Sequence, residues 1–206
     1  MPPTSTTSEQ FLQGLGSIHE SVRGDGRTTL KRILNTCEEM LRDRKCTEVH
    51  VEHNVLDAIE QGNRPVIYGT CADGSATSVY IHVEEKVGIK FARALLEAAR
   101  ENESIVIVSL EGPTPFTRKE CDDKKIQFMN AKDVCVNKTR HFLVPKHEKV
   151  ESPPDGVLVC DLPKISEMDP IVQYYNFEVG SILKMMRTFG GHEKIPYYRV
   201  VTAASS

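Results

Sequence analysis

The chain contains 206 residues, of which 39% are hydrophobic and 27% are charged, a balance typical of globular proteins. Its formal net charge of -3 excludes a global positive field that would draw it to nucleic acid, so any DNA contact has to be local. Because no apolar run approaches a membrane span and the six cysteines form no CxxC pair or zinc pattern, we expect no membrane contact, no metal and no other cofactor.

Residues 1–26 are predicted to form a flexible tail. The first eight residues are polar and lack the basic-then-apolar order of a secretory signal, which favours a reducing compartment. Two glycine-rich interruptions, at residues 14–16 and 24–26, disfavour a continuous helix.

The first strong element is an amphipathic helix between Arg27 and Lys45. Its apolar residues recur at helical spacing and most charged residues lie away from them, which predicts one buried face. Thr28 or Thr29 is the expected cap of the first turn. The apolar stripe consists of Leu30, Ile33, Leu34, Cys37, Met40 and Leu41.

An α/β layer is predicted to follow. Residues 65–70 and 77–84 favour two strands, joined by a turn at Asp73-Gly74. Residues 89–100 favour a helix, and the continuous apolar run at 104–110 is typical of a central strand covered on both faces. Strand, helix and strand in this order indicate an α/β module up to about residue 140.

The sequence changes character after Arg140. The proline-rich residues 151–156 cannot continue regular structure, because proline lacks the backbone donor. Asp169-Pro170 predicts the start of a short helix that ends at Asn176. Residues 181–187 and 197–201 then favour the two strands of a hairpin around Gly190-Gly191.

The C-terminal motifs, in this order, resemble the fifth subunit shared by eukaryotic nuclear DNA-directed RNA polymerases, and its smaller counterpart in archaeal polymerases. The family has a leucine-valine-proline-lysine-histidine segment, an aspartate-proline helix start, a glycine turn, a lysine-to-arginine strand and a tyrosine-arginine strand. Here these correspond to residues 143–147, Asp169-Pro170, Val179-Gly180, residues 184–187 and Tyr198-Arg199. The joint match is specific, although each short motif alone is weak.

The resemblance extends more thinly to residues 27–140. Arg42-Asp43-Arg44, the segment 81–86 and Thr114-Pro115 are similar to steps in the family's jaw domain. The resemblance implies two domains. The first is an α/β jaw domain at 27–140, with a restriction-endonuclease-like topology but without nuclease activity, and the second is a small α+β assembly domain at 141–206.

The resemblance implies a non-catalytic polymerase subunit in the nucleus, or in the nucleolus if it serves polymerase I alone. Its expected partners are the largest polymerase subunit, other polymerase subunits and, weakly, downstream double-stranded DNA. The expected assembly residues are His141, Val144, Pro145, His147, Asp169, Pro170, Tyr174, Arg187, Tyr198 and Arg199.

The chain also departs from the family pattern. The family inserts a charged helix before the aspartate-proline step, where this chain has Pro153-Pro154-Asp155-Gly156, so that helix is expected to be lost. Val179-Gly180 replaces a basic arginine-glycine turn. These changes indicate a divergent member whose contacts with the large subunits differ.

The candidate DNA contact is the loop at residues 113–119. By the resemblance, Thr114, Pro115, Arg118 and Lys119 would lie near downstream DNA, and the two cations would touch phosphates without reading sequence. The alternative is a solvated basic pair that begins a helix, offset by the acidic residues that follow it.

Two other functions remain open. A magnesium-dependent nuclease would use Asp73, Glu84 and Lys86, because carboxylate oxygens are ligands that Mg²⁺ prefers. Against it, Asp73 lies in a turn, and the other two belong to a charge cluster where a strand ends. The chain could also be a free-standing interaction adaptor.

Overall fold

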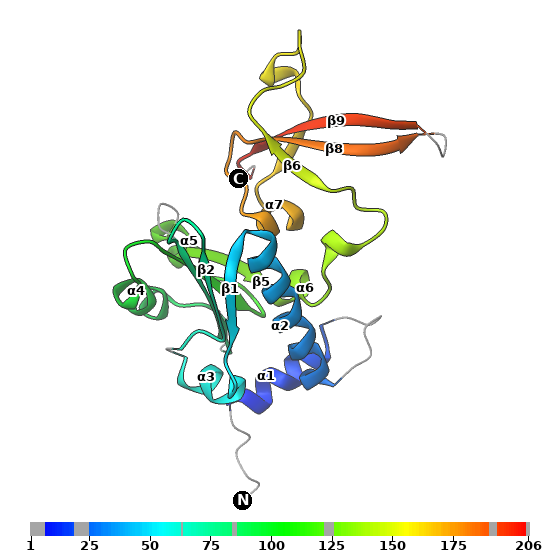
Figure 1. Ribbon diagram of the computed structural model, residues 1–206. Coiled ribbons are helices and arrows are strands. Elements are labelled where there is room, and N and C mark those ends of the chain that lie inside the picture. Colours follow the sequence, from blue (N-terminus) through cyan, green and yellow to red (C-terminus); the bar gives the residue numbers. More distant parts are fainter. Residues whose placement is uncertain are drawn as a thin grey trace, which may run out of the picture. The chain divides into compact units, whose positions relative to one another are not determined.

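The computed structural model describes residues 7–18, 25–62, 64–83, 86–121, 126–189 and 193–204 (Figure 1). The chain divides into two compact units, Met1–Val136 (unit 1) and Asn137–Ser206 (unit 2), each with its own sheet. The mixed α/β class expected from the sequence is therefore confirmed. Within the described residues, no helix has the length and apolar character needed to cross a membrane.

Unit 1 is built on a five-stranded sheet with the order β1-β2-β3-β4-β5. The strands β1, β2 and β3 pair antiparallel, whereas β3, β4 and β5 pair parallel. Its elements are α1 (Thr7–Gly16), α2 (Gly26–Asp43), β1 (Cys46–Val51), α3 (Val55–Gln61), β2 (Ile67–Cys71), β3 (Ala76–His82), α4 (Ile89–Ala98), β4 (Glu103–Ser109), α5 (Pro115–Glu120), β5 (Ile126–Asn130) and α6 (Ala131–Val134).

The centre of this sheet is covered on both faces. Every residue of β3 is buried, and β4 lies between β3 and β5 as its continuous apolar run predicted. On one face Tyr80 and Ile107 share a core cluster with Leu95 of α4. On the other face Leu41 of α2 lies over β2, where a Cβ at Gly69 would come within 3.1 Å of it. A larger residue at position 69 would therefore force the Leu41 side chain to shift.

The helix α2 confirms the predicted amphipathic helix, but its cap lies earlier in the chain. Leu30, Ile33 and Met40 belong to the buried face, as expected. The backbone N–H of Thr28 donates to Oδ1 of Asp25 at 2.7 Å, so Asp25 is the cap rather than Thr28 or Thr29. This hydrogen bond also lowers the pKa of Asp25, because it stabilises the carboxylate.

The helix α1 corrects the expectation of a flexible tail for residues 7–16, whereas residues 1–6 and 19–24 of that tail lie outside the described residues. Within it Phe11 and Leu15 are 2% and 1% exposed, one helical turn apart. The glycine-rich segment ends the helix at Gly16 instead of preventing it. Two apolar residues give only a weak periodic signal in the sequence. The segment forms a helix here because these two side chains become buried.

Unit 2 consists of a four-stranded sheet with the order β6-β8-β9-β7 and one short α-helix. The predicted helix and hairpin are both confirmed, and in Figure 1 the hairpin is the orange and red pair of arrows. Residues 190–191, the expected hairpin loop, lie outside the described residues. The elements are η1 (Lys138–Arg140), β6 (His147–Val150), η2 (Val159–Asp161), β7 (Lys164–Ser166), α7 (Pro170–Tyr175), β8 (Ile182–Phe189) and β9 (Glu193–Thr202).

Alternating residues of the hairpin fill the core of unit 2. Leu183, Met185 and Val201 are buried together with Val172 of α7. The intervening Ile182 and Val200 pack with Leu162 in a second cluster. Because strand side chains alternate between faces, a short hairpin supplies both clusters. Between β6 and Asp169 the chain forms only η2 and β7, so the charged α-helix of the family is absent from this interval, as expected.

Candidate functional site

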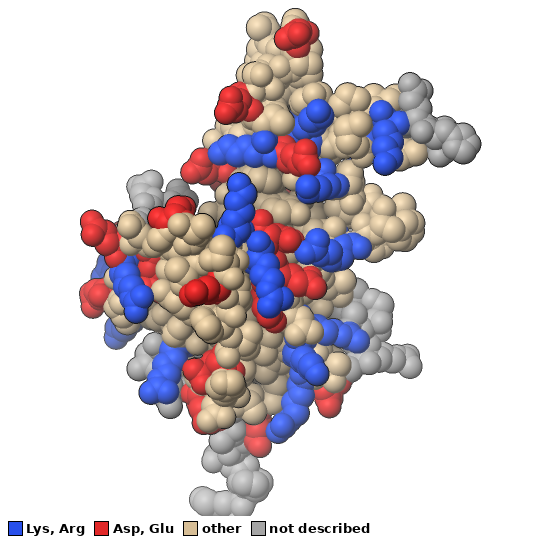
Figure 2. Space-filling view, in the orientation of Figure 1, with Lys and Arg blue, Asp and Glu red and all other residues tan. Residues whose placement is uncertain are grey.

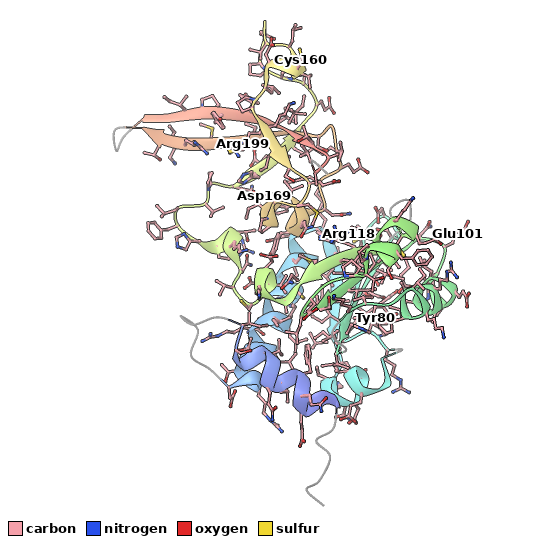
Figure 3. The ribbon with its side chains drawn as sticks, turned by 180° about the vertical axis from the view of Figure 1, so that it is seen from behind. Tyr80, Glu101, Arg118, Cys160, Asp169 and Arg199 are labelled. Carbon is pink, nitrogen blue, oxygen red and sulfur yellow. The ribbon has the colours of Figure 1, made fainter. Side chains whose placement is uncertain are left out.

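The motif residues of unit 2 come together although they are far apart in the sequence. His147 on β6 pairs with Met185 on β8, and Met185 in turn pairs with Tyr197 on β9. Figure 3 shows Arg199 on the hairpin and Asp169 at the start of α7, in the same unit. The sheet register therefore brings the segment that ends at His147 next to the two strands of the hairpin.

Two arginines approach one tyrosine ring on this hairpin. The guanidinium carbon of Arg187 lies 4.5 Å from the ring centroid of Tyr197, and that of Arg199 lies 5.5 Å from it. Arg187 pairs with Ile195, two residues before the ring, and Arg199 follows the ring by two. These three residues, which we call the arginine–tyrosine cluster, place two cations within cation–π distance of one ring.

Part of this cluster is withdrawn from water. The Nε atom of Arg199 is buried and has no hydrogen-bond partner among the described residues. Buried donors are normally satisfied, so an orphaned guanidinium N–H is unusual. Arg187, by contrast, is exposed.

His147 lies beside the same charges. Its Nδ1–H donates to the carbonyl of Pro145 at 2.8 Å, which leaves Nε2 without a proton in the neutral ring. Burial lowers the pKa of His147; the hydrogen bond to Pro145 and the charge of Asp169 oppose this shift, while Arg199 and Arg187 add to it. The ring is thus held in position and favoured in its neutral form.

Asp169, Pro170 and Tyr174 hold α7 in place. Oδ1 of Asp169 accepts from the backbone N–H of Ile171 at 2.8 Å, and Pro170 occupies the first turn. Tyr174 is 4% exposed, and its hydroxyl accepts from Nδ2 of Asn137 at 3.2 Å. Tyr174 therefore has packing and hydrogen-bonding roles in this fold. No local sequence signal indicated Asn137.

Replacing the cap tests this arrangement. Asp169→Ala removes the acceptor for the first turn of α7, and we expect the free energy of unfolding to fall by about 1 kcal/mol. The control is Asp155→Ala, which removes a carboxylate in the proline-rich turn and is expected to change stability by less than about 0.5 kcal/mol. Urea denaturation of the full chain measures both, and equal effects would contradict the capping role.

The segment before β6 exposes apolar side chains. Phe142 and Leu143 are 87% and 71% exposed, and the Phe142 ring stacks on His141 at a centroid distance of 4.9 Å. The Nδ1 of His141 accepts from the backbone N–H of Leu143 at 3.3 Å. Large apolar side chains exposed together are typical of interaction surfaces. Sequence reasoning chose Val144 and missed these two, because a single sequence does not show which residues of an apolar run are exposed.

The predicted DNA-contact loop is largely a helix. Thr114 caps α5 by accepting from the backbone N–H of Thr117 at 3.2 Å, and Pro115 begins the helix. Arg118 and Lys119 are exposed on its last turn. Glu120, which follows them, forms an ion pair with Arg93 at 3.0 Å. The basic pair therefore lies at the end of a helix rather than at its start, and a phosphate contact by these side chains stays a prediction.

No magnesium site is formed by the nuclease candidates that the structure describes. Oδ1 of Asp73 accepts from the backbone N–H and the hydroxyl of Ser75, at 2.9 and 2.6 Å. These bonds lower the pKa of Asp73, as expected for a turn aspartate. Lys86 is exposed, and Glu84 lies outside the described residues. Within the described ranges, no group of three His, Cys, Asp or Glu side chains could hold a metal ion.

Comparisons with known proteins find a family match in unit 2 and relatives along most of the chain. Residues 156–201, which include α7 and most of the β8–β9 hairpin, match the family "RNA polymerase Rpb5, C-terminal domain". The chain is 26% identical over 203 residues to DNA-directed RNA polymerases I, II, and III subunit RPABC1 of Caenorhabditis elegans, covering 84% of this chain and 95% of that protein. Its counterpart in Dictyostelium discoideum is 27% identical over 177 residues, or 77% and 89%.

A third relative, RPABC1 of Caenorhabditis briggsae, is 26% identical over 136 residues, and the match spans 64% of that protein's length and 60% of this chain. Low identity along most of the chain, together with a family match confined to unit 2, agrees with the divergence that the altered turns and the missing helix indicated. Residues 156–201 are thus similar to the Rpb5 C-terminal domain, and most of the chain is similar, at low identity, to the RPABC1 subunits.

Proposed function

We propose that this chain is a non-catalytic subunit of a multisubunit DNA-directed RNA polymerase. Unit 2 acts as the assembly domain and docks on the largest subunit. The observation that supports this most directly is that the Rpb5-like residues 156–201 form most of a sheet unit that carries the arginine–tyrosine cluster. Its relatives are named as subunits of polymerases I, II and III, so the proposed location is the nucleus, and the nucleolus if the chain serves polymerase I alone.

Unit 1 has the proposed role of a jaw near downstream DNA. Its sheet combines an antiparallel β1-β2-β3 part with a parallel β3-β4-β5 part, which is compatible with a restriction-endonuclease-like topology that serves as a scaffold. The turn position of Asp73 favours this scaffold role over nuclease chemistry.

Copurification from cells tests the polymerase assignment. Tagged full-length chain is expected to recover the large polymerase subunits, whereas a chain that lacks residues 141–206 is expected to recover none, because the docking unit is gone. The matched control deletes residues 1–6, which precede the first described helix. Recovery of the tagged chain alone, as a monomer, would favour the adaptor alternative and contradict the proposal.

The DNA contact has a separate test. The double variant Arg118→Ala with Lys119→Ala removes both cations from the polymerase. If each of them touches a phosphate, the slope of log binding constant against log salt concentration should become shallower by about 0.9 per lost contact. Lys31→Ala with Arg32→Ala on α2 removes the same charge elsewhere and controls for net charge. An unchanged slope would show that these two side chains do not touch DNA.

A further inference from the structure

The arginine–tyrosine cluster carries two cations that the described part of unit 2 does not neutralise. Among the described residues, no ion pair joins Arg187 or Arg199 to a carboxylate. Asp169 influences the neighbouring His147, but its Oδ1 is engaged by the backbone N–H of Ile171. Through this oxygen Asp169 caps α7.

Position and burial distinguish this cluster from the other surface cations. The ring of Tyr197 is half-buried and packs against the core of unit 2, so it fixes the site to which both guanidinium groups are drawn. The Nε of Arg199 is enclosed without an acceptor, which leaves that cation partly desolvated and unpaired. A carboxylate gains more from such a cation than from one in open water, because the local dielectric is lower.

We propose that Arg187 and Arg199 receive a carboxylate side chain of the largest polymerase subunit, against the Tyr197 ring. The guanidinium fork matches a carboxylate in two parallel hydrogen bonds, which a lysine ammonium does not reproduce. The neutral His147 ring adds no further charge to repel or attract the ligand. This acidic docking contact presupposes the polymerase function proposed above and specifies the chemistry of the partner.

The charge of unit 2 favours a protein carboxylate over nucleic acid. Residues 137–206 contain nine Lys and Arg against eight Asp and Glu. Figure 2 shows the two signs interspersed on the visible face, without an extended basic groove. Nucleic-acid binding depends on several cations along a backbone, whereas one paired site suits a single acidic side chain.

Copurification with point variants of the full chain tests the contact. Arg187→Gln and Arg199→Gln are each expected to lower the recovered large subunit about tenfold or more, since truncating one member of a charged pair in an interface is costly. Lys184→Gln and Lys194→Gln remove the same charge from the same hairpin outside the cluster, and should recover polymerase as the wild type does. Thermal unfolding of each purified variant identifies any loss caused by misfolding, and the exposed Arg187 keeps the test valid if Arg199→Gln does not fold.

Cross-linking identifies the chemical group of the partner that faces Arg187. In Arg187→Lys, a water-soluble carbodiimide should activate the facing carboxylate, which the lysine Nζ then attacks to form an amide with release of the urea. Mass spectrometry should find this amide on an acidic residue of the largest subunit, in nuclease-treated extracts.

Each outcome separates the contact from the general function. If the wild-type chain recovers polymerase and both glutamine variants recover the same amount, the acidic docking contact is overturned, but the proposed function is not. If the lysine controls lose as much polymerase as the glutamine variants, the effect is one of general charge. If nuclease treatment abolishes the recovery, nucleic acid mediates it. Either result would also overturn the acidic docking contact. Failure of the wild type to recover polymerase would instead reject the proposed function.

Discussion

Leu183→Ala is expected to lower the free energy of unfolding of unit 2 by about 2–5 kcal/mol, because it deletes buried methyl groups and leaves a cavity. Leu183 has no exposed surface and belongs, with Met185 and Val172 of α7, to one core cluster. A unit of this size is stabilised by only about 3–5 kcal/mol, so the substitution removes most of its stability. The variant should therefore also lose polymerase in copurification.

Leu158→Ala is the matched control for this prediction. Leu158 is 66% exposed, and the same truncation there should change stability by less than about 0.5 kcal/mol. Urea denaturation, followed by hydrogen exchange of the β8 and β9 amides, locates the loss in unit 2. If the two alanine variants unfold at the same urea concentration, the hairpin does not form the core described here.

Gly26→Ala is expected to destabilise unit 1 by about 1–3 kcal/mol through steric overlap with the backbone. A Cβ at this position would lie 1.8 Å from the carbonyl oxygen of Leu12 in α1, a contact that no side-chain rotation can relieve. Either α1 or the first turn of α2 has to move, and movement of α1 would expose Phe11 and Leu15. The methyl group therefore acts on the packing of two helices.

Gly88→Ala controls for the loss of a glycine at the start of a helix. Gly88 precedes α4, and no atom lies within 4 Å of the position its Cβ would take. This variant should keep wild-type stability in thermal unfolding, and hydrogen exchange should show protected α1 amides. Faster exchange in α1 of Gly26→Ala but not of Gly88→Ala is the expected pattern; the same pattern in both variants would reject the close approach of α1 and α2.

Elements with local signals were predictable from the sequence. The helix α7 begins at Pro170 and ends before Asn176 because an aspartate cap, a proline in the first turn and a residue that tolerates φ of 54° are all local features. The amphipathic stripe of α2 and the apolar run of β4 are equally local. The sequence-based prediction places the cap of α2 too late in the chain. Asp25 lies between two glycines, and such a segment is typical of a break between helices rather than of a helix start.

Short elements at the sheet edges were not predictable in the same way. The strands β6 and β7 are four and three residues long, and they exist because β8 and β9 offer partners for their hydrogen bonds. The helix α1 likewise depends on the burial of Phe11 and Leu15. Such elements are stabilised by neighbours distant in sequence, which propensity does not describe.

By itself, the sequence determined the order of the C-terminal motifs, the α/β character of residues 27–140, and the family resemblance that the comparisons then supported. Only the tertiary structure decided that Arg187, Tyr197 and Arg199 share one cluster, that Tyr174 is buried, and that Phe142 and Leu143 are exposed. Motifs and caps are properties of neighbouring residues in the chain. Pairing register and burial depend on which distant strands meet, because every side chain changes face when a register shifts by one residue.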